Sequence, residues 1–519
     1  MFKKYIIEFI EVYFIFFTKI FFIGKKFLHN IKNYEVLLVY IYQWILKNLF
    51  FNIISMIIIL FLLMLLIFNY FNFNIKLIFF WFYFFINLDN ISWLFIFLTI
   101  LLFFLCFISM KDKYFGIKYK SNIFLFLLIS LFVILIGVFS VNDFLSFYIL
   151  FEITLIPMFF IIGIWGSRQR KIHATYMFFL YTYIGSIFFL IAVFILLSKY
   201  MNIQIWNLLI VDVCNEYFIW FCFFFALCIK VPMFPFHIWL PEAHVEAPTI
   251  GSVLLAGILL KLGTYGMLKY LLPIFPNATI YFYPLVLLMC ILAILYVSYT
   301  TIRQIDLKKI IAYASIAHMA YVILGLFNST LFGIIGSIYL MISHGLVSGA
   351  LFFAIGVLYH RYHTRIIFYY NGLLYFMPIY GSILLFLTLS NMSFPGTSNF
   401  IGEFLIILGL IYDNMFICLI AVLGIIPSAI YSIWFFNRLI GGLLNWQQFK
   451  YYSDINFNEF FILIFLIFYI VIGGLFPSFI IERLEYNVYL ILEYTYITNW
   501  DYLFNNIYNN LILKKNKTK

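Results

Sequence analysis

The sequence is poor in charge. Only 10% of its 519 residues are Asp, Glu, Lys or Arg, whereas 66% are hydrophobic and the mean hydropathy is +1.09. A soluble domain carries about 25% charged residues, so a water-soluble protein is excluded. Backbone groups in hydrocarbon must be satisfied within their own segment, which excludes an open sheet. The composition therefore predicts an all-α polytopic membrane protein.

Cysteine is scarce and scattered. The six cysteines lie mostly within apolar runs, no two form a CxxC pair, and none groups with histidine at metal-ligand spacing: Cys106, Cys214, Cys222, Cys228, Cys290 and Cys418. The chain also lacks a GxGxxG motif after a strand and a haem-binding motif. We expect no disulfide, no metal and no redox cofactor on this chain.

The first 26 residues, MFKKYIIEFIEVYFIFFTKIFFIGKK, lack a small-residue cleavage site and carry two glutamates, so we expect neither a signal peptide nor a transit peptide. Phe (70 residues) and Tyr (41 residues) are abundant. Together with the frequent Ile, Asn and Lys, this bias suits codons rich in A and T and indicates an organelle genome.

Apolar runs long enough to cross a membrane, about 20 residues each, recur along the chain. They fall at 90–109, 122–141, 143–163, 174–198, 215–245, 249–272, 278–299, 308–327, 330–358, 373–412, 414–438 and 457–476. Runs near 5–23 and 51–70 bring the expected total to about 14 helices. The expected organisation is N-terminal helices and extension (1–89), a peripheral helix with a basic loop (90–121), two five-helix repeats (122–272 and 273–440), and a C-terminal helix and tail (441–519).

Lysine and arginine gather on alternate loops between these runs. The basic loops hold Lys111, Lys113, Lys118, Lys120, Arg168, Arg170, Lys171, Arg303, Lys308, Lys309, Arg361, Arg365, Arg438 and Lys450. This asymmetry places the basic loops in the cytoplasm or the matrix. Because the charge is dispersed over short loops, the net charge of +11 predicts contact with phospholipid head groups, including cardiolipin, and no nucleic acid.

Few ionisable residues lie inside the expected spans. Those that stand out are Glu152, Lys230, Lys261, His318, His344 and Glu403. A lysine at a helix centre costs about 2.5–3.5 kcal/mol on insertion scales, so such residues usually mark a pathway. A histidine titrates near neutral pH and suits a proton relay. Other interpretations stay open: a buried structural ion pair for Glu152 and Lys261, a helix-end lysine reaching the interface for Lys230, and hydrogen-bonded core histidines.

Two expected spans are interrupted. KVPMFPFHIWLPEAHVEAP places Pro232 and Pro235 after one apolar run, and NMSFPGTSNFIGEF places Pro395 and Gly396 between two others. Proline removes a backbone donor and clashes with the preceding turn, so each helix should break there. The broken helix is the fourth of five in both sets. Because five helices are an odd number, the second set starts on the opposite side of the membrane, so we expect it to be inverted relative to the first. Broken helices at matching positions point to an ion pathway.

Four more polar residues, His237, Glu242, His244 and Glu246, lie near the basic end of the first broken helix. They would either admit protons or cap helices and bind loop partners. Lys269 is expected to be an interfacial anchor, and His360 and His363 to belong to a loop outside any relay.

Several motifs resemble one family closely. FYILFEITLIPMFFIIGIWG, KVPMFPFHIWLPEAHVEAPTIGSVLLAGILLKLGTYGMLKY, DLKKIIAYASIAHMAYV, MISHGLVSGALF and FPGTSNFIGEF occur in one collinear order over about residues 90–440. They resemble the subunit 4 family of mitochondrial NADH:ubiquinone oxidoreductase, the antiporter-like membrane subunits of respiratory complex I. The first ninety residues and the tail ITNWDYLFNNIYNNLILKKNKTK match nothing in this family.

The resemblance implies a proton relay of Glu152, Lys230, Lys261, His318, His344 and Glu403 along the membrane midplane. It implies a multi-pass protein of the mitochondrial inner membrane that neighbours other membrane-arm subunits, among them antiporter-like ones. It also implies that FMN, iron-sulfur clusters and ubiquinone act in other subunits. Two alternatives remain: a subunit of a multisubunit cation/proton antiporter, or a membrane-arm scaffold that does not pump.

Overall fold

The computed structural model describes residues 89–110, 121–199, 215–442 and 453–492. Within these ranges nearly every residue is helical, and Asp306 and Ile366 form an isolated antiparallel β-bridge. Ten helices in the described part are long and apolar enough to cross a membrane. The expected all-α polytopic fold is therefore confirmed, whereas the helices expected at 5–23 and 51–70 lie outside the described residues, so the total of about 14 stays a prediction.

α5 (Asn90–Met110) precedes the first helix set, and the helices of that set follow the expected apolar runs. They are α6 (Ser121–Ser140), α7 (Phe144–Ile153), α8 (Leu155–Trp165), α9 (Lys171–Lys199), α11 (Glu216–Lys230) and α12 (Trp239–Glu246). The next span is continuous but changes its winding: α13 (Thr249–Leu254), the π-helical turn η1 (Leu255–Leu259), α14 (Leu260–Gly266), the π-helical turn η2 (Met267–Leu271) and α15 (Leu272–Ile274).

The second set begins with α16 (Pro276–Leu292), η3 (Ala293–Val297) and α17 (Ser298–Ile302). It continues with α18 (Leu307–Phe327), α19 (Leu331–Tyr362), α20 (Pro378–Asn391), α21 (Ser398–Asp413), α22 (Met415–Leu423) and α23 (Ile425–Ile440), and α24 (Phe457–Leu475) follows. α19 runs a full turn beyond the apolar run. His360 therefore lies in that helix and not in a loop as expected, while His363 ends it in a left-handed conformation (φ 54°).

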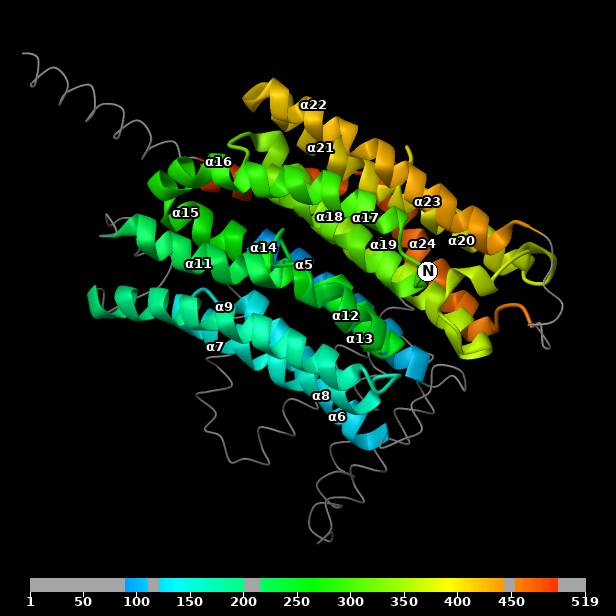
Figure 1. Cartoon of the computed structure of the whole chain (residues 1–519). Coiled ribbons are helices and arrows are strands. Elements are labelled where there is room, and N and C mark those ends of the chain that lie inside the picture. Colours follow the sequence, from blue (N-terminus) through cyan, green and yellow to red (C-terminus); the bar gives the residue numbers. More distant parts are fainter. Residues whose placement is uncertain (1–88, 111–120, 200–214, 443–452, 493–519) are drawn as a thin grey trace, which may run out of the picture. The chain divides into compact units, whose positions relative to one another are not determined.

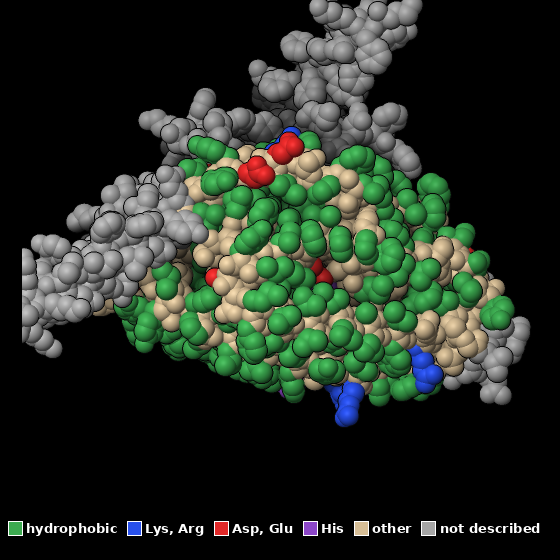
Figure 2. All heavy atoms as spheres, turned by 90° about the horizontal axis from the view of Figure 1, so that it is seen from above, with side chains coloured by type: hydrophobic (Ala, Val, Ile, Leu, Met, Phe, Trp, Pro, Cys, Tyr) green, Lys and Arg blue, Asp and Glu red, His purple; other side chains and the backbone are tan. Residues whose placement is uncertain are grey.

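Apolar side chains cover most of the face in Figure 2, and few charged ones interrupt them. Inside, one long apolar stretch of α13–α15 and one of α19 are fully buried, and that of α18 is almost fully buried. Most helices in Figure 1 run in roughly the same direction, side by side. Lys261, His318 and His344 therefore lie on helices surrounded by other helices.

Both interruptions lie at the proline-containing segments. Val231–Ile238 separate α11 from α12, and the indole Nε1 of Trp239 donates a hydrogen bond to the carbonyl of Ile229 across this break (2.9 Å). Met392–Thr397 separate α20 from α21, and Gly396 in this segment adopts a φ of +94°, which favours glycine. Whether the two helix sets are inverted repeats stays a prediction.

Glycine allows α19 and α21 to approach closely. A Cβ atom at Gly402 would lie 2.8–2.9 Å from Leu340, including its backbone, and one at Gly336 would lie 2.8 Å from the backbone nitrogen of Ile406. Small residues at such a crossing let two helix backbones come together in a membrane. Glu403 follows Gly402 directly, so the crossing carries it toward the centre of the bundle.

Contacts between helix ends agree with the expected sides of the membrane. On the basic side, Lys309 of α18 binds Glu242 of α12 (Nζ to Oε1, 2.7 Å). On the opposite side, the Glu216 carboxylate accepts a hydrogen bond from the backbone nitrogen of Ala278 (2.9 Å). Each contact joins two ends that the loop charges assign to one side.

Candidate functional site

His318 and Glu403 are in direct contact. His318 Nδ1 of α18 lies 3.0 Å from Glu403 Oε1 of α21, and the two residues are only 2% and 5% exposed. Glu403 lies in the second turn after the break between α20 and α21, so the interrupted helix places a carboxylate deep in the protein. A hydrogen bond of this length allows a proton to pass between the two side chains.

Lys261 and His344 form a second contact. Lys261 Nζ of α14 lies 2.9 Å from His344 Nδ1 of α19, and Lys261 is 0% exposed. The same Nζ donates a hydrogen bond to the carbonyl of Ala256 (2.5 Å). Ala256 belongs to the π-helical turn η1, one turn before the lysine. Such turns occur frequently at functional sites, and here the turn provides an acceptor for a buried ammonium group.

The two pairs adjoin each other. The ring centroids of His318 and His344 are 5.6 Å apart, with the ring planes tilted by 46°. Lys261, His344, His318 and Glu403 therefore form a continuous row, which we call the central row. It takes one side chain from each of α14, α19, α18 and α21. Among these four described side chains, the two end pairs are hydrogen-bonded, whereas the imidazoles of His344 and His318 are not hydrogen-bonded to each other.

Lys230 and Glu152, the other two predicted relay residues, are not in direct contact. Lys230 Nζ makes no hydrogen bond or ion pair with any described residue, and Glu152 Oε1 is likewise buried without a hydrogen-bond partner in the described ranges. The ammonium group instead lies over the ring of Phe151, 4.4 Å from its centroid. A cation this close to an aromatic face is attracted by it.

The end of α11 packs tightly against the helix that carries Lys261. A Cβ atom at Gly263 would lie 2.4 Å from Val231 Cγ2 and 3.1 Å from the carbonyl oxygen of Leu227. Glycine at this position lets the residues around Lys230 approach α14. The structure thus brings four of the six predicted residues into one row of contacts. Lys230 and Glu152 are not part of that row, and Lys230 lies over the ring of Phe151, the residue before Glu152.

The four polar residues near the basic end of the first broken helix behave differently from one another. Glu246 accepts hydrogen bonds from the backbone nitrogen of Arg168 (3.2 Å) and the hydroxyl of Ser167 (3.4 Å), and Glu242 pairs with Lys309. Glu246 thus binds a loop, and Glu242 binds the first turn of α18. His244 stacks on Phe352 (centroids 4.6 Å apart), and neither of its ring nitrogens is hydrogen-bonded to a described residue.

Arg365, which the sequence assigns only to a basic loop, reaches into the same region and is 1% exposed. Its guanidinium donates hydrogen bonds to the carbonyl of Val245 and to the hydroxyl of Ser167. Burial lowers the pKa of this guanidinium, and the nearby Glu246 carboxylate partly offsets the effect. Lys308 Nζ donates to the carbonyl of Ala247 (2.7 Å). Two cations from the second helix set therefore cap the end of α12.

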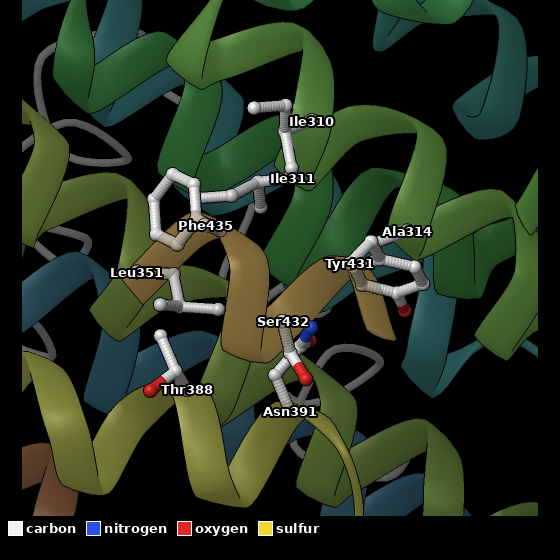
Figure 3. Close-up of a pocket in the computed structure, with 9 residues that line it drawn as sticks. All are labelled: Ile310, Ile311, Ala314, Leu351, Thr388, Asn391, Tyr431, Ser432 and Phe435. Carbon is white, nitrogen blue, oxygen red and sulfur yellow. The ribbon is translucent and has the colours of Figure 1, made fainter. Parts of the chain in front are cut away.

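The cavity in Figure 3 is small. Its volume is about 10 Å³, and polar side chains from α20 and α23, Thr388, Asn391, Tyr431 and Ser432, lie around it beside apolar ones from α18 and α19. This volume holds one water molecule at most, so it is no site for a substrate or a cofactor. No group of three or more His, Cys, Asp or Glu within the described ranges is arranged to hold a metal ion.

Lys269 does more than anchor a helix end. Its Nζ pairs with Asp89 Oδ2 (3.3 Å) and donates to the hydroxyl of Ser92 (3.2 Å), and its side chain is only 11% exposed. The Ser92 hydroxyl lies 2.9 Å from that of Tyr265, which donates to the carbonyl of Phe139 (3.0 Å). This chain of contacts ends at a backbone carbonyl, which cannot pass a proton on, so it ties helix ends together.

Comparison with known protein families supports one assignment. Residues 141–429 match the family model described as NADH:quinone oxidoreductase/Mrp antiporter, TM. This range contains all six predicted relay residues. It also contains both interrupted helices.

Curated relatives cover most of the chain. It is 51% identical over 414 residues to the NADH-ubiquinone oxidoreductase chain 4 of Acanthamoeba castellanii, a match that spans 79% of this chain and 82% of that protein. It is 47% identical over 409 residues to the protein of the same name from Arabidopsis thaliana, over 78% of this chain and 81% of the relative.

Solved structures share the fold. A chain of respiratory complex I from Thermus thermophilus is 29% identical with a TM-score of 0.72, over 79% of this chain and 85% of that one. A chain of the Mrp complex from Dietzia sp. is 18% identical with a TM-score of 0.71, over the same shares of the two chains. The second likeness shows the fold alone.

Proposed function

This chain belongs to the NADH-ubiquinone oxidoreductase chain 4 family of antiporter-like membrane subunits, and we propose from this that it moves protons within the membrane arm of respiratory complex I. The observation that carries the proposal is the central row. A proton carrier in a membrane needs titratable groups in contact across its interior, and Lys261, His344, His318 and Glu403 are in contact over four separate helices.

The proposed mechanism follows from which groups exchange protons. Lys261 donates to His344 through the contact between Nζ and Nδ1, and His318 exchanges with Glu403 through the contact between Nδ1 and Oε1. Imidazole can accept a proton at one ring nitrogen and release it from the other, so the two histidines suit the middle of the row. Removing a nearby cation or anion changes the proton affinity of the next group, which drives the proton onward.

Lys230 and Glu152 would supply that change of charge. Each acts on the other electrostatically, although they are not in direct contact. When Lys230 approaches Glu152 its charge is compensated, and when it leaves, its charge acts on the neighbouring groups. The close packing of α11 on α14 at Gly263 puts this switch next to the helix of Lys261. We infer that it triggers proton movement along the central row.

We further propose the mitochondrial inner membrane as the location, with other membrane-arm subunits and phospholipid, including cardiolipin, as partners. Electron transfer through FMN, iron-sulfur clusters and ubiquinone is assigned to other subunits of the complex. The relatives named NADH-ubiquinone oxidoreductase chain 4 support the assembly into that enzyme. The basic loops support the contact with anionic lipid.

Neither alternative is favoured. The likeness to the Mrp complex is 18% in sequence, whereas the likeness to chain 4 of NADH-ubiquinone oxidoreductase reaches 51%. A scaffold that does not pump has no need of a buried lysine in contact with a buried histidine. Burying such groups in a membrane is energetically costly, and where they occur they usually mark a pathway.

Replacing Lys261 with methionine tests the proposal, because methionine fills similar space and holds no proton. We expect Lys261→Met to assemble and to lose proton pumping, measured beside NADH:quinone turnover in membranes. Lys171→Met is the matched control, since Lys171 Nζ binds the carbonyl of Ile164 at the basic surface (2.8 Å). If both variants assemble and pump at the normal rate, the central row is structural and the proposal is wrong.

A further inference from the structure

The contact between Lys230 and Phe151 is unusual for a lysine this deeply placed. Lys230 is 3% exposed and its ammonium group has no hydrogen-bond acceptor among the described residues. The ring of Phe151 lies 4.4 Å from Nζ, and the Glu152 carboxylate acts on the ammonium group without a hydrogen bond to it. Buried charges are costly unless something compensates them, so this ring has a specific effect on the lysine.

Phe151 and Glu152 are neighbours in the last turn of α7, which ends at Ile153. The hydroxyl of Thr154, just beyond the helix, donates to the carbonyl of Phe151 (2.7 Å) and fixes the backbone there. Consecutive helix residues point about 100° apart. Two neighbouring residues, the aromatic Phe151 and the acidic Glu152, can therefore each stabilise the lysine. In this structure the ammonium group lies over the ring and is not in contact with the carboxylate.

We propose that Phe151 is a positioning residue that holds the Lys230 ammonium while its ion pair with Glu152 is open. This inference rests on the proposed proton relay and deepens it. The lysine then has two defined positions: over the Phe151 ring, or against the Glu152 carboxylate. Without the ring, the open position offers no compensation for the buried charge, and the switch loses one of its two states.

The groups that act on this switch are few. Among the described residues, Glu152 is the titratable side chain whose charge acts on Lys230. The hydroxyl of Ser186 on α9 acts on Glu152 as a hydrogen-bond donor. Glu152 and Tyr183 of α9 in turn act on Tyr148, one turn earlier on α7. A change at Phe151 should therefore be read out through Lys230 and Glu152 alone.

The test compares Phe151→Leu with Phe151→Tyr in the assembled complex. Leucine keeps an apolar side chain without a ring, and tyrosine keeps the ring. We expect protons pumped per electron pair to fall roughly tenfold in Phe151→Leu, within the range of a buried cation and ring contact, and to stay near normal in Phe151→Tyr. As the pH is raised, the residual pumping of Phe151→Leu should also be lost at a lower pH than pumping by the wild type. The reason is that Lys230 has lost a group that favours its charged form.

Phe144→Leu is the matched control. Phe144 is two turns earlier on α7, fully buried among the rings of Phe189, Phe223 and Tyr270, and no lysine or arginine lies over it within the described ranges. It should pump normally. If Phe151→Leu does not assemble, Phe151→Met replaces it, since methionine is similar in size and has no ring.

The outcomes separate two failures. If Lys230→Met pumps normally, the proposed relay through Lys230 is wrong. If Lys230→Met does not pump while Phe151→Leu pumps with normal stoichiometry and pH dependence, the relay stands and the role of Phe151 is overturned. If Phe151→Leu and Phe151→Tyr are equally impaired, Phe151 contributes packing and not a site for the cation, which also overturns the inference.

Discussion

Glu403 is the acidic member of the central row, and its carboxylate contacts His318 at 3.0 Å. Glutamine has nearly the same shape and still hydrogen-bonds the imidazole, but it holds no transferable proton. We expect Glu403→Gln to assemble normally and to pump at least about a hundredfold less efficiently, a typical effect of losing a general acid or base. The measurement is proton uptake by vesicles at matched NADH:quinone turnover.

Glu485→Gln serves as the control for this prediction, because Glu485 is exposed and takes no part in the central row. It should leave pumping unchanged. Full pumping by the Glu403 variant would mean that protons leave the row by another group.

For individual residues, the sequence predicts which charged side chains are buried but not which of them are in contact. The six candidates stand out because charged residues are rare in apolar runs, and four of them do form a row of contacts. The position of Lys230 over Phe151 could not be predicted, since it depends on a rotamer, and one phenylalanine among 70 carries no distinguishing signal. The role of Ala256 could not be predicted either, because its backbone carbonyl becomes available to Lys261 only through the π-helical turn.

Among the helices, the crossing of α19 and α21 depends on Gly402. A methyl group there would lie 2.8–2.9 Å from Leu340, and part of that residue is backbone that cannot rotate away. We expect Gly402→Ala to push the two helices apart, at a cost of about 1–3 kcal/mol, and to separate Glu403 from His318. Thermal stability of the assembled complex and proton pumping should both fall.

Gly163→Ala provides a comparison for this change. A Cβ atom at Gly163 meets only Thr175 Cγ2 at 3.5 Å, an ordinary contact, so this variant should behave like the wild type. Equal stability of the two variants would show that the α19 and α21 crossing adapts without loss.

The interrupted helices were predictable because proline breaks a helix for local reasons. Pro232, Pro235 and Pro395 lie in the two segments between α11 and α12 and between α20 and α21. The π-helical turns could not be predicted, since no residue type by itself requires an extra residue in a helical turn. Length also misled at one place: α19 continues a turn past its apolar run, through His360, because polar residues at a membrane surface extend a helix as readily as they end it.

For the molecule as a whole, α24 is attached through a buried ion pair. Arg361 of α19 donates two hydrogen bonds to the carboxylate of Glu459 (3.0 and 2.7 Å) and two more to the backbone of Ser453 and Asp454. The Glu459 side chain is 0% exposed. Removing one partner leaves a buried charge unpaired, so Arg361→Met should destabilise the protein by about 3–5 kcal/mol.

The double variant Arg361→Met with Glu459→Leu tests the reason for this loss. It removes both charges, so it should be more stable than Arg361→Met alone in thermal unfolding of the complex. A double variant as unstable as the single one would instead point to the lost backbone hydrogen bonds.

The sides of the membrane follow from loop charges, and the contacts between helix ends agree with that assignment. Glu242 with Lys309 on one side and Glu216 with the backbone of Ala278 on the other are examples. Pairings of this kind could not be predicted individually, because they join residues more than sixty positions apart and depend on how the helices pack. The alternation of basic loops constrains only which ends share a side.

The cap on α12 has a consequence for synthesis of the chain. The carbonyls of Ala247 and Val245 are satisfied by Lys308 and Arg365, which follow them by 61 and 120 residues. While the ribosome is still making those later segments, the carbonyls at the end of the first broken helix lack their donor partners. The contacts that hold this helix end therefore form only after the second helix set has been made.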